Sequence, residues 1–295
     1  MKKILITGAN SYIGTAVESW LVQYEELYTV ETVDMIDGMW REKDFSEYDV
    51  VYHVAGIAHA DVGKVSEETK AFYYKINTDL AFETAKKAKA EGVKQFIFMS
   101  SMIIYGESGG YGRAKMIHKD TIPSPANFYG DSKWQADQKI QRLEDESFKV
   151  VIVRPPMIYG KGSKGNYPTL AKMAKKLPVF PNVQNQRSML HIDNLCEFIR
   201  LMIENEETGV FFPQNSEYSQ TSQLVQMIAT STENHIILTK LLNPFVWIAS
   251  CIPGKISGLI NKAFGNLTYD KEMSVYPKGT YQIVSLEESI RKTEH

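Results

Sequence analysis

The feature that most constrains this chain is a strand, a glycine turn and a helix in immediate succession at its start. An apolar run from Lys3 to Thr7 leads directly into a turn from Gly8 to Gly14, and a helical pattern then runs through Leu21. In such a unit, backbone N–H groups at the helix N-terminus face an anion, and glycine lets a pyrophosphate approach closely. The turn reads Gly-x-x-Ser-x-x-Gly, with Ser11 at the central position. We expect a dinucleotide to bind there.

A second predicted strand, from Tyr28 to Val33, ends in Asp34. An acidic side chain at this point of a dinucleotide fold holds the 2′-hydroxyl of the adenosine ribose and repels a 2′-phosphate. No Lys or Arg follows before Arg41. The expected cofactor is therefore NAD and not NADP.

Further apolar runs end at Val54, at Ser100 and at Val153, and a helical stretch from Ala71 to Ala90 carries Asn77 inside it. Apolar runs of this kind are typical of parallel strands that are buried on both faces. The pattern predicts an α/β fold with a doubly wound parallel sheet (Rossmann) and a smaller C-terminal substrate-binding lobe. We expect residues 1–160 to form mainly the NAD-binding domain. Residues 161–295 would form mainly the lobe, with some return of the chain to the first domain.

Tyr129 and Lys133 are four residues apart and would lie one helical turn from each other. A tyrosine titrates near pH ~10, and lowering its pKa to ~7 requires about 4 kcal/mol. A unit charge at ~4 Å in an effective dielectric of ~20 supplies roughly that energy. The spacing therefore predicts that Lys133, alone or together with a cationic cofactor ring, makes Tyr129 acidic enough to act as a general base. Ser100 and Ser101, at the end of a predicted strand, lie where such sheets carry their chemistry.

These motifs occur together with several others in a fixed order along the chain. The stretches are Thr7–Gly14, Asp34, His53–Gly56, Asn77, Ser100–Gly106, Tyr129–Lys133, Arg154–Gly160 and Arg187–Asp193. In this combination the chain resembles the extended short-chain dehydrogenase/reductases that act on nucleotide sugars, the group that includes UDP-galactose 4-epimerase. The resemblance implies an enzyme in which Ser101 holds the substrate oxygen that Tyr129 deprotonates. It also implies that Lys133 anchors the nicotinamide ribose and that Arg187 contacts the diphosphate.

The site residues that follow from the motifs and the resemblance form three sets. The catalytic set is Ser101, Tyr129 and Lys133. The cofactor-binding set is Gly8, Asn10, Ser11, Tyr12, Ile13, Gly14, Asp34, Ala55, Gly56, Ile57, Asn77, Ser100, Tyr129, Lys133 and Pro156. The substrate-binding set is Ser101, Met102, Tyr129 and Arg187. No metal site is expected, and we interpret His53 and His59 as structural or loop residues because no carboxylate or cysteine set accompanies them.

Three functions are compatible with these residues. The one we favour is an NAD-dependent 4-epimerase of a UDP-sugar. Asp34 favours NAD over NADP, and an epimerase returns the hydride it removes, so it can keep one NAD without exchange. A 4-ketoreductase of a UDP-4-keto sugar in surface-polysaccharide biosynthesis is the alternative, and a non-catalytic dinucleotide sensor is a more distant one. A 4,6-dehydratase is disfavoured because Met102 and Ile103 stand where that branch of the family has an Asp-Glu pair.

Composition sets further limits. The chain has 295 residues, 43% of them apolar, and a net charge of −2, so neither a nucleic-acid partner nor a charged tail is indicated. Two cysteines are too few for a disulfide framework and fit a reducing cytoplasm. The apolar run after Lys3 is too short for an export signal, so we expect a cytoplasmic enzyme. A homodimer is a candidate assembly.

One apolar stretch, residues 241–260, needs a separate interpretation. Pro244, Pro253 and Lys255 interrupt it and leave no run of about 18 apolar residues, so we expect no membrane insertion. Packing against the sugar or against a partner is the interpretation we favour, and attachment to a bilayer surface is the alternative.

Overall fold

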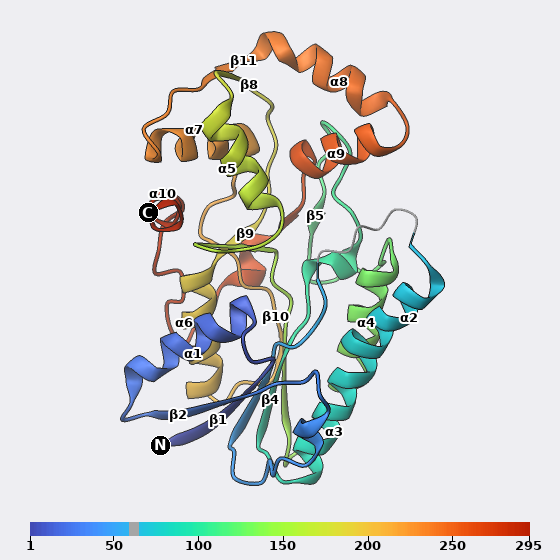
Figure 1. Ribbon diagram of the computed structural model, residues 1–295, viewed down its shortest axis with the longest axis vertical. Coiled ribbons are helices and arrows are strands. Elements are labelled where there is room, and N and C mark those ends of the chain that lie inside the picture. Colours follow the sequence, from blue (N-terminus) through green and yellow to red (C-terminus); the bar gives the residue numbers. More distant parts are fainter. Residues whose placement is uncertain (59–64) are drawn as a thin grey trace.

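The protein is built around a six-stranded parallel sheet. The computed structural model describes residues 1–58 and 65–295, and the strand order of the sheet is β10-β6-β4-β3-β1-β2 (Figure 1). The strands are β1 Lys2–Thr7, β2 Tyr28–Val33, β3 Val50–His53, β4 Gln95–Met99, β6 Lys149–Val153 and β10 Gly209–Phe211. All strands are parallel, but β2 lies on one side of β1 whereas β3 and the later strands lie on the other. A ligand crevice is expected at the carboxyl ends of β1 and β3, where this order reverses.

The central strands are apolar throughout because both faces of the sheet are covered. In β4, Ile97 and Met99 pack into one core cluster, whereas Phe96 and Phe98 pack into the cluster on the opposite face. The same alternation holds in the neighbouring strand β6. Successive side chains of a strand point to opposite faces of the sheet, so each central strand contributes to two separate hydrophobic cores.

Helices cover the two faces in different sets. Figure 1 shows α1 (Tyr12–Leu21) and α6 (Ile192–Glu204) on one side of the sheet. On the other side lie α2 (Glu67–Tyr74), α3 (Ala81–Ala90) and α4 (Phe128–Gln141). This arrangement confirms the predicted doubly wound Rossmann fold.

The predicted helix from Ala71 to Ala90 is longer and less regular than expected. It begins at Glu67, where the Ser66 hydroxyl accepts a hydrogen bond from Thr69 N–H, and a π-helical turn, Lys75–Leu80, separates α2 from α3. Such turns contain an extra residue and are frequent at functional sites. Here the turn contains Asn77, whose side chain is fully buried.

The smaller part of the molecule is drawn above the sheet in Figure 1 and has its own core. Its helices are α5 Asn166–Lys176, α7 Thr221–Ser231, α8 Asn243–Cys251, α9 Lys255–Phe264 and α10 Leu286–Glu294. Short parallel pairs join β5 Met116–Ile117 to β12 Thr268–Tyr269, β7 Met157–Tyr159 to β9 Met189–His191, and β8 Val179–Pro181 to β11 Ile237–Thr239. Both α6 and β10 come from chain beyond residue 160 and pack with the large sheet. The division at residue 160 stays a prediction.

Single turns of 3₁₀ helix complete the described secondary structure. They are Val22–Tyr24, Met39–Arg41, Met102–Tyr105, Lys240–Leu242 and Lys271–Ser274. Of the helices formed by residues 1–58 and 65–295, none is long and apolar enough to cross a membrane.

Candidate active site

The glycine turn between β1 and α1 is shaped by close backbone contacts. Gly8 has a φ of +96°, and a Cβ at this position would lie 2.9 Å from the Cα of Ala55. Gly14 N–H donates a hydrogen bond of 3.1 Å to Ser11 Oγ, so the serine at the centre of the motif is the N-cap of α1. The serine therefore closes the first helical turn, and glycine is needed at position 8 because a side chain there would collide with Ala55.

Other residues predicted around this turn have structural contacts of their own. Asn10 has a φ of +62°, in the left-handed region, and Tyr12 and Ile13 pack against the core cluster beneath α1. Burial raises the pKa of the Tyr12 phenol above its ordinary value. The predicted contacts of Tyr12 and Ile13 with a cofactor stay predictions.

Asp34 follows β2 directly and is exposed, as the sequence predicts for the residue that reads the adenosine ribose. Its Oδ1 accepts a hydrogen bond of 2.7 Å from Ile36 N–H, which fixes the carboxylate at the end of the strand. An exposed carboxylate at this point can accept a hydrogen bond from a 2′-hydroxyl.

Gly56, Asn77 and Lys133 converge beyond the end of β3. A Cβ on Gly56 would lie 3.0 Å from both Asn77 Oδ1 and Lys133 Nζ, so only glycine leaves this space open. Asn77 Oδ1 accepts a hydrogen bond from Ile57 N–H, and its amide donates to Ile57 O and to Ser132 Oγ. The π-helical turn thus ties the loop after β3 to α4, the helix that carries Lys133.

Lys133 is a buried cation whose side chain is only slightly exposed. Its Nζ donates a 3.0 Å hydrogen bond to Met99 O at the end of β4 and lies 5.2 Å from the centre of the Phe98 ring. Burial lowers the pKa of Lys133 to about 8. The ammonium is therefore held between the two strand ends with donors available for a ligand.

Tyr129 lies half-buried in the first turn of α4, and its hydroxyl interacts with Ser101. Burial raises the pKa of Tyr129 to about 12, the Ser101 interaction acts to lower it, and Tyr73 acts to raise it. The prediction that Lys133 makes Tyr129 acidic is thus wrong for the chain by itself, since Lys133 points to the Met99 carbonyl. Ser101 precedes a 3₁₀ turn, and its hydroxyl accepts a hydrogen bond from Ile103 N–H.

A buried polar network, which the sequence did not predict, lies beneath these residues. Asp137 accepts hydrogen bonds from Ser100 Oγ at 2.7 Å and from Arg154 Nε and Nη2 at 2.9 Å each. Arg154 Nη1 also donates to the Tyr105 hydroxyl at 2.8 Å. The Ser100 hydroxyl, which we expected to face the cofactor, is therefore used within the protein. The one signal in the sequence is that Asp137 lies one helical turn after Lys133.

The residues that follow Ser101 are apolar, and they pack against other apolar side chains. Met102 is 5% exposed and packs in a cluster with Ile104, while its N–H donates to Pro155 O. Pro156, expected beside the cofactor, is buried next to that contact. Neither Met102 nor Ile103 can donate or accept a proton, which agrees with the exclusion of a dehydratase.

Arg187, the residue expected at the diphosphate, lies in the smaller part of the molecule. Burial lowers the pKa of its guanidinium, and Nη1 donates to Lys262 O and Gly265 O at 3.1 Å each, at the end of α9. Within the described part of the chain, no carboxylate pairs with it. A partly buried cation without a carboxylate partner suits an anionic ligand.

His53 is buried among aromatic side chains. Its Nδ1 lies 2.7 Å from Thr7 Oγ1, and burial lowers its pKa to about 3, so the imidazole is neutral at physiological pH. His59 lies outside the described residues. No group of three His, Cys, Asp or Glu side chains suited to a metal ion occurs in residues 1–58 and 65–295.

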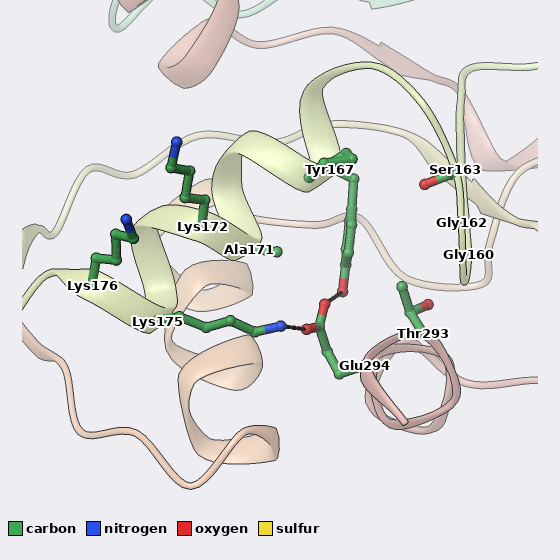
Figure 2. A pocket seen from close by; sticks show the side chains of 11 residues that line it. Gly160, Gly162, Ser163, Tyr167, Ala171, Lys172, Lys175, Lys176, Thr293 and Glu294 are labelled. Carbon is green, nitrogen blue, oxygen red and sulfur yellow. Dashed lines mark hydrogen bonds and ion pairs between the residues drawn. The ribbon is translucent and has the colours of Figure 1, made fainter.

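A cavity of about 510 Å³ lies elsewhere, between α5 and α10. Figure 2 shows Glu294 at its centre, where the carboxylate pairs with Lys175 at 2.7 Å and accepts from the Tyr167 hydroxyl at 3.0 Å. Lys172 and Lys176 point away from Glu294 in this view. The cavity contains none of the predicted site residues, so we do not take it as the active site.

Residues 4–213 match the model of the NAD dependent epimerase/dehydratase family. The chain belongs to this family. It is an enzyme of the extended short-chain dehydrogenase/reductase type, and NAD is its cofactor. The residues fit NAD, because a strand, a glycine turn and a helix follow one another from Lys2 to Leu21 and the Asp34 carboxylate is exposed after β2.

Members with curated functions resemble the chain over much of its length. The UDP-glucose 4-epimerase of Vibrio cholerae is 29% identical, covering 99% of this chain and 94% of that protein. The N-acetyl-alpha-D-glucosaminyl-diphospho-ditrans,octacis-undecaprenol 4-epimerase of Escherichia coli O157:H7 is 26% identical over 70% of this chain and 64% of its own.

Several solved structures have the same fold as this chain. The UDP-glucuronic acid 4-epimerase of Bacillus cereus, solved with UDP-glucuronic acid and NAD, has a TM-score of 0.74 at 18% identity, with 99% of this chain and 98% of that chain covered. A dTDP-4-dehydrorhamnose reductase from Clostridium acetobutylicum has a TM-score of 0.73 at 19% identity, with 99% and 98% covered. The roles of the individual site residues stay predictions.

Proposed function

We propose that the protein is an NAD-dependent 4-epimerase of a UDP-sugar. The observation that carries the proposal is the grouping of Tyr129 with Ser101 at one end of α4 and of Lys133 with Gly56 one turn further along. This grouping supports a site in which a phenol, a hydroxyl and an ammonium lie near the carboxyl ends of the strands, where the ligand crevice is expected. The relative from Vibrio cholerae supports the choice of a UDP-sugar and of epimerisation at carbon 4.

Tyr129 acts as the base in the proposed reaction. It takes the proton of the sugar's 4-hydroxyl while the hydrogen on carbon 4 leaves as hydride, and it returns the proton when the 4-keto group is reduced on the other face. Ser101 holds the reacting oxygen by a hydrogen bond. Bound NAD supplies the hydride acceptor and then the donor, so the reaction consumes no cofactor.

The pKa of Tyr129 must fall when the site is loaded. Burial holds this pKa near about 12 in the protein alone, so that the phenol is protonated at neutral pH. Lys133 is the protein's own cation nearest to the glycine cradle, and its ammonium would stabilise the phenolate only after turning from Met99 O. We propose that ligand binding causes this turn.

Arg187 is proposed to bind the diphosphate of the substrate. Its guanidinium is partly buried and has two backbone carbonyls as partners, which leaves further donors for a phosphate. The planar fork of arginine suits two phosphate oxygens at once.

The direct test is to incubate the purified protein with UDP-glucose and with UDP-N-acetylglucosamine, without added reductant, and to follow the galacto isomers by NMR. Interconversion of either pair is expected. The second candidate function is the 4-ketoreductase, which the shared fold with dTDP-4-dehydrorhamnose reductase keeps open. Failure to form an isomer from either sugar, together with NADH oxidation on a UDP-4-keto sugar, would transfer the assignment to the reductase.

A further inference from the structure

The helices α8 and α9 carry an exposed apolar surface at one end of the molecule. We name it the α8–α9 surface and define it by Leu241, Phe245, Trp247, Ile248, Ile256 and Leu259. The exposed fraction of these side chains runs from 50% at Ile256 to 82% at Leu241. Figure 1 shows α8 at the top of the molecule and α9 beneath it, far from strands β1 and β2 at the bottom.

Only one side of this helical pair is needed for the fold. Val246, Ile260 and Ala263 pack against the core of the smaller part, and Phe264 is buried in it. α8 itself has no buried residue. The large apolar side chains of the α8–α9 surface are therefore exposed to solvent, and several such side chains on two adjoining helices indicate an interaction site.

The charge around the surface has a single sign. Lys240, Lys255 and Lys262 are exposed, and residues 234–269 contain no Asp or Glu, although the chain has 35 of them in total. None of the three lysines forms an ion pair with a carboxylate of the described residues. Aromatic and aliphatic side chains flanked by lysines are the pattern of helices that lie in the headgroup region of a membrane.

We propose that the α8–α9 surface binds the surface of a lipid bilayer that contains anionic lipids. Phe245, Trp247 and Leu259 would enter the headgroup boundary, and the lysines would bind the anionic headgroups. The contact is peripheral, because neither helix is long enough to span a bilayer. The proposal adopts the bilayer alternative that the sequence left open, in place of packing against the sugar or a partner.

A second copy of the chain fits this surface less well. A two-fold contact would place the same lysines of both copies close together, with no carboxylate between residues 234 and 269 to compensate them. An anionic bilayer supplies the missing negative charge. The proposal concerns attachment alone and does not depend on the reaction that the enzyme catalyses.

The test is co-sedimentation of the full chain with vesicles of phosphatidylcholine alone and with vesicles of equal parts phosphatidylcholine and phosphatidylglycerol. We expect binding to the anionic vesicles, weakened by salt, with Phe245→Gln/Trp247→Gln abolishing it. Lys255→Gln/Lys262→Gln should weaken partitioning by about fivefold for each charge removed. Trp247 fluorescence should shift to the blue with anionic vesicles, and a Trp247→Phe variant should lose that component.

Matched control variants distinguish binding by the α8–α9 surface from nonspecific vesicle binding by exposed apolar or basic side chains elsewhere. Ile122→Gln/Val275→Gln removes two apolar side chains that are 83% and 73% exposed elsewhere, and Lys172→Gln/Lys176→Gln removes two exposed lysines of α5. Both should bind like the original chain, and all variants should keep its unfolding temperature. The proposal is overturned if the original chain ignores anionic vesicles, or if Phe245→Gln/Trp247→Gln binds them unchanged. A dimer that this double variant dissociates, without vesicle binding, would assign the surface to a second copy.

Discussion

Arg154 and Asp137 form a buried two-point ion pair that joins the end of β6 to the middle of α4, with both N···O distances at 2.9 Å. The Asp137 side chain is completely buried, and Ser100 Oγ supplies it with a further donor. Because Asp137 follows Lys133 by one helical turn, this pair fixes the helix that carries Tyr129 and Lys133 against the sheet. A buried pair of this kind positions more than it stabilises.

Removing one partner of the pair should be costly. Asp137→Asn leaves the Arg154 cation buried without a counter-charge, and we expect the free energy of unfolding to fall by about 3–5 kcal/mol. Urea denaturation measures this loss. Glu67→Gln, which breaks the exposed pair with Lys70, serves as the control and should cost less than about 1 kcal/mol. A loss for Asp137→Asn as small as that of the control would contradict the role of the buried pair.

Tyr129→Phe should lower turnover by roughly 10²–10⁴-fold, because the phenol is the proposed acid and base. The ring and its packing against Tyr73 remain, so NAD affinity should change little. Isomer formation from the UDP-sugar and NAD titration are the two measurements. Tyr73→Phe is the matched control and should keep near-normal turnover. Near-normal turnover of Tyr129→Phe would remove the assigned role.

Lys133→Met should make the protein more stable and less active. The pKa of Lys133 in the folded state is about 8, below its ordinary value of 10.5. Below pH 8 the buried ammonium therefore destabilises the folded state relative to the unfolded chain. This cost disappears as the pH rises from 8 to 10.5, where the folded state has already released the proton. We expect a gain of about 1–3 kcal/mol at pH 7, after the lost hydrogen bond to Met99 O is deducted. The gain should shrink above pH 8.

Two measurements test the Lys133 prediction. The free energy of unfolding of Lys133→Met, relative to the original chain, should be followed from pH 6 to pH 10.5. NAD affinity and turnover should both fall at pH 7. A variant that is less stable than the original at pH 7 would show that the buried ammonium does not destabilise the folded state. Unchanged NAD affinity would remove the proposed ribose contact.

Asp34→Ser should change the preferred dinucleotide. The original chain should bind NAD more tightly than NADP, because its exposed carboxylate accepts from a 2′-hydroxyl and repels a 2′-phosphate. Loss of one charged hydrogen bond, about 1.5–3 kcal/mol, should weaken NAD binding roughly tenfold to a hundredfold while NADP binding improves. Calorimetric titration of both dinucleotides is the check. Equal affinities in the original chain would contradict the assignment.

Arg187→Ala should weaken the binding of free UDP and of UDP-sugars by the same factor, about tenfold or more, because the proposed contact is to phosphate. Arg187→Lys should recover part of the loss by keeping the charge without the planar fork. Competition with a fluorescent UDP derivative measures both. If only one sugar nucleotide loses affinity while free UDP does not, Arg187 belongs to the sugar pocket.

The sequence by itself determined the fold class and the strand, turn and helix on which the predicted nucleotide site is built. Strand β2 has the predicted limits, Tyr28–Val33, and Asp34 follows it as expected. These features are local, because the period of apolar side chains and the glycines of the turn specify strands, a helix start and a close backbone approach without reference to distant residues. The spacing of Tyr129 and Lys133 likewise placed both on one helix.

The tertiary structure alone decided what those side chains contact. In the chain by itself, Lys133 donates to Met99 O and does not acidify Tyr129, whose pKa burial raises to about 12. A pKa depends on burial and on neighbours that come from distant parts of the chain, and helical spacing reports neither. The pairing of Asp137 with Arg154 and the outward side of α8 and α9 were decided in the same way, by which segments the folded chain packs together and which it leaves uncovered.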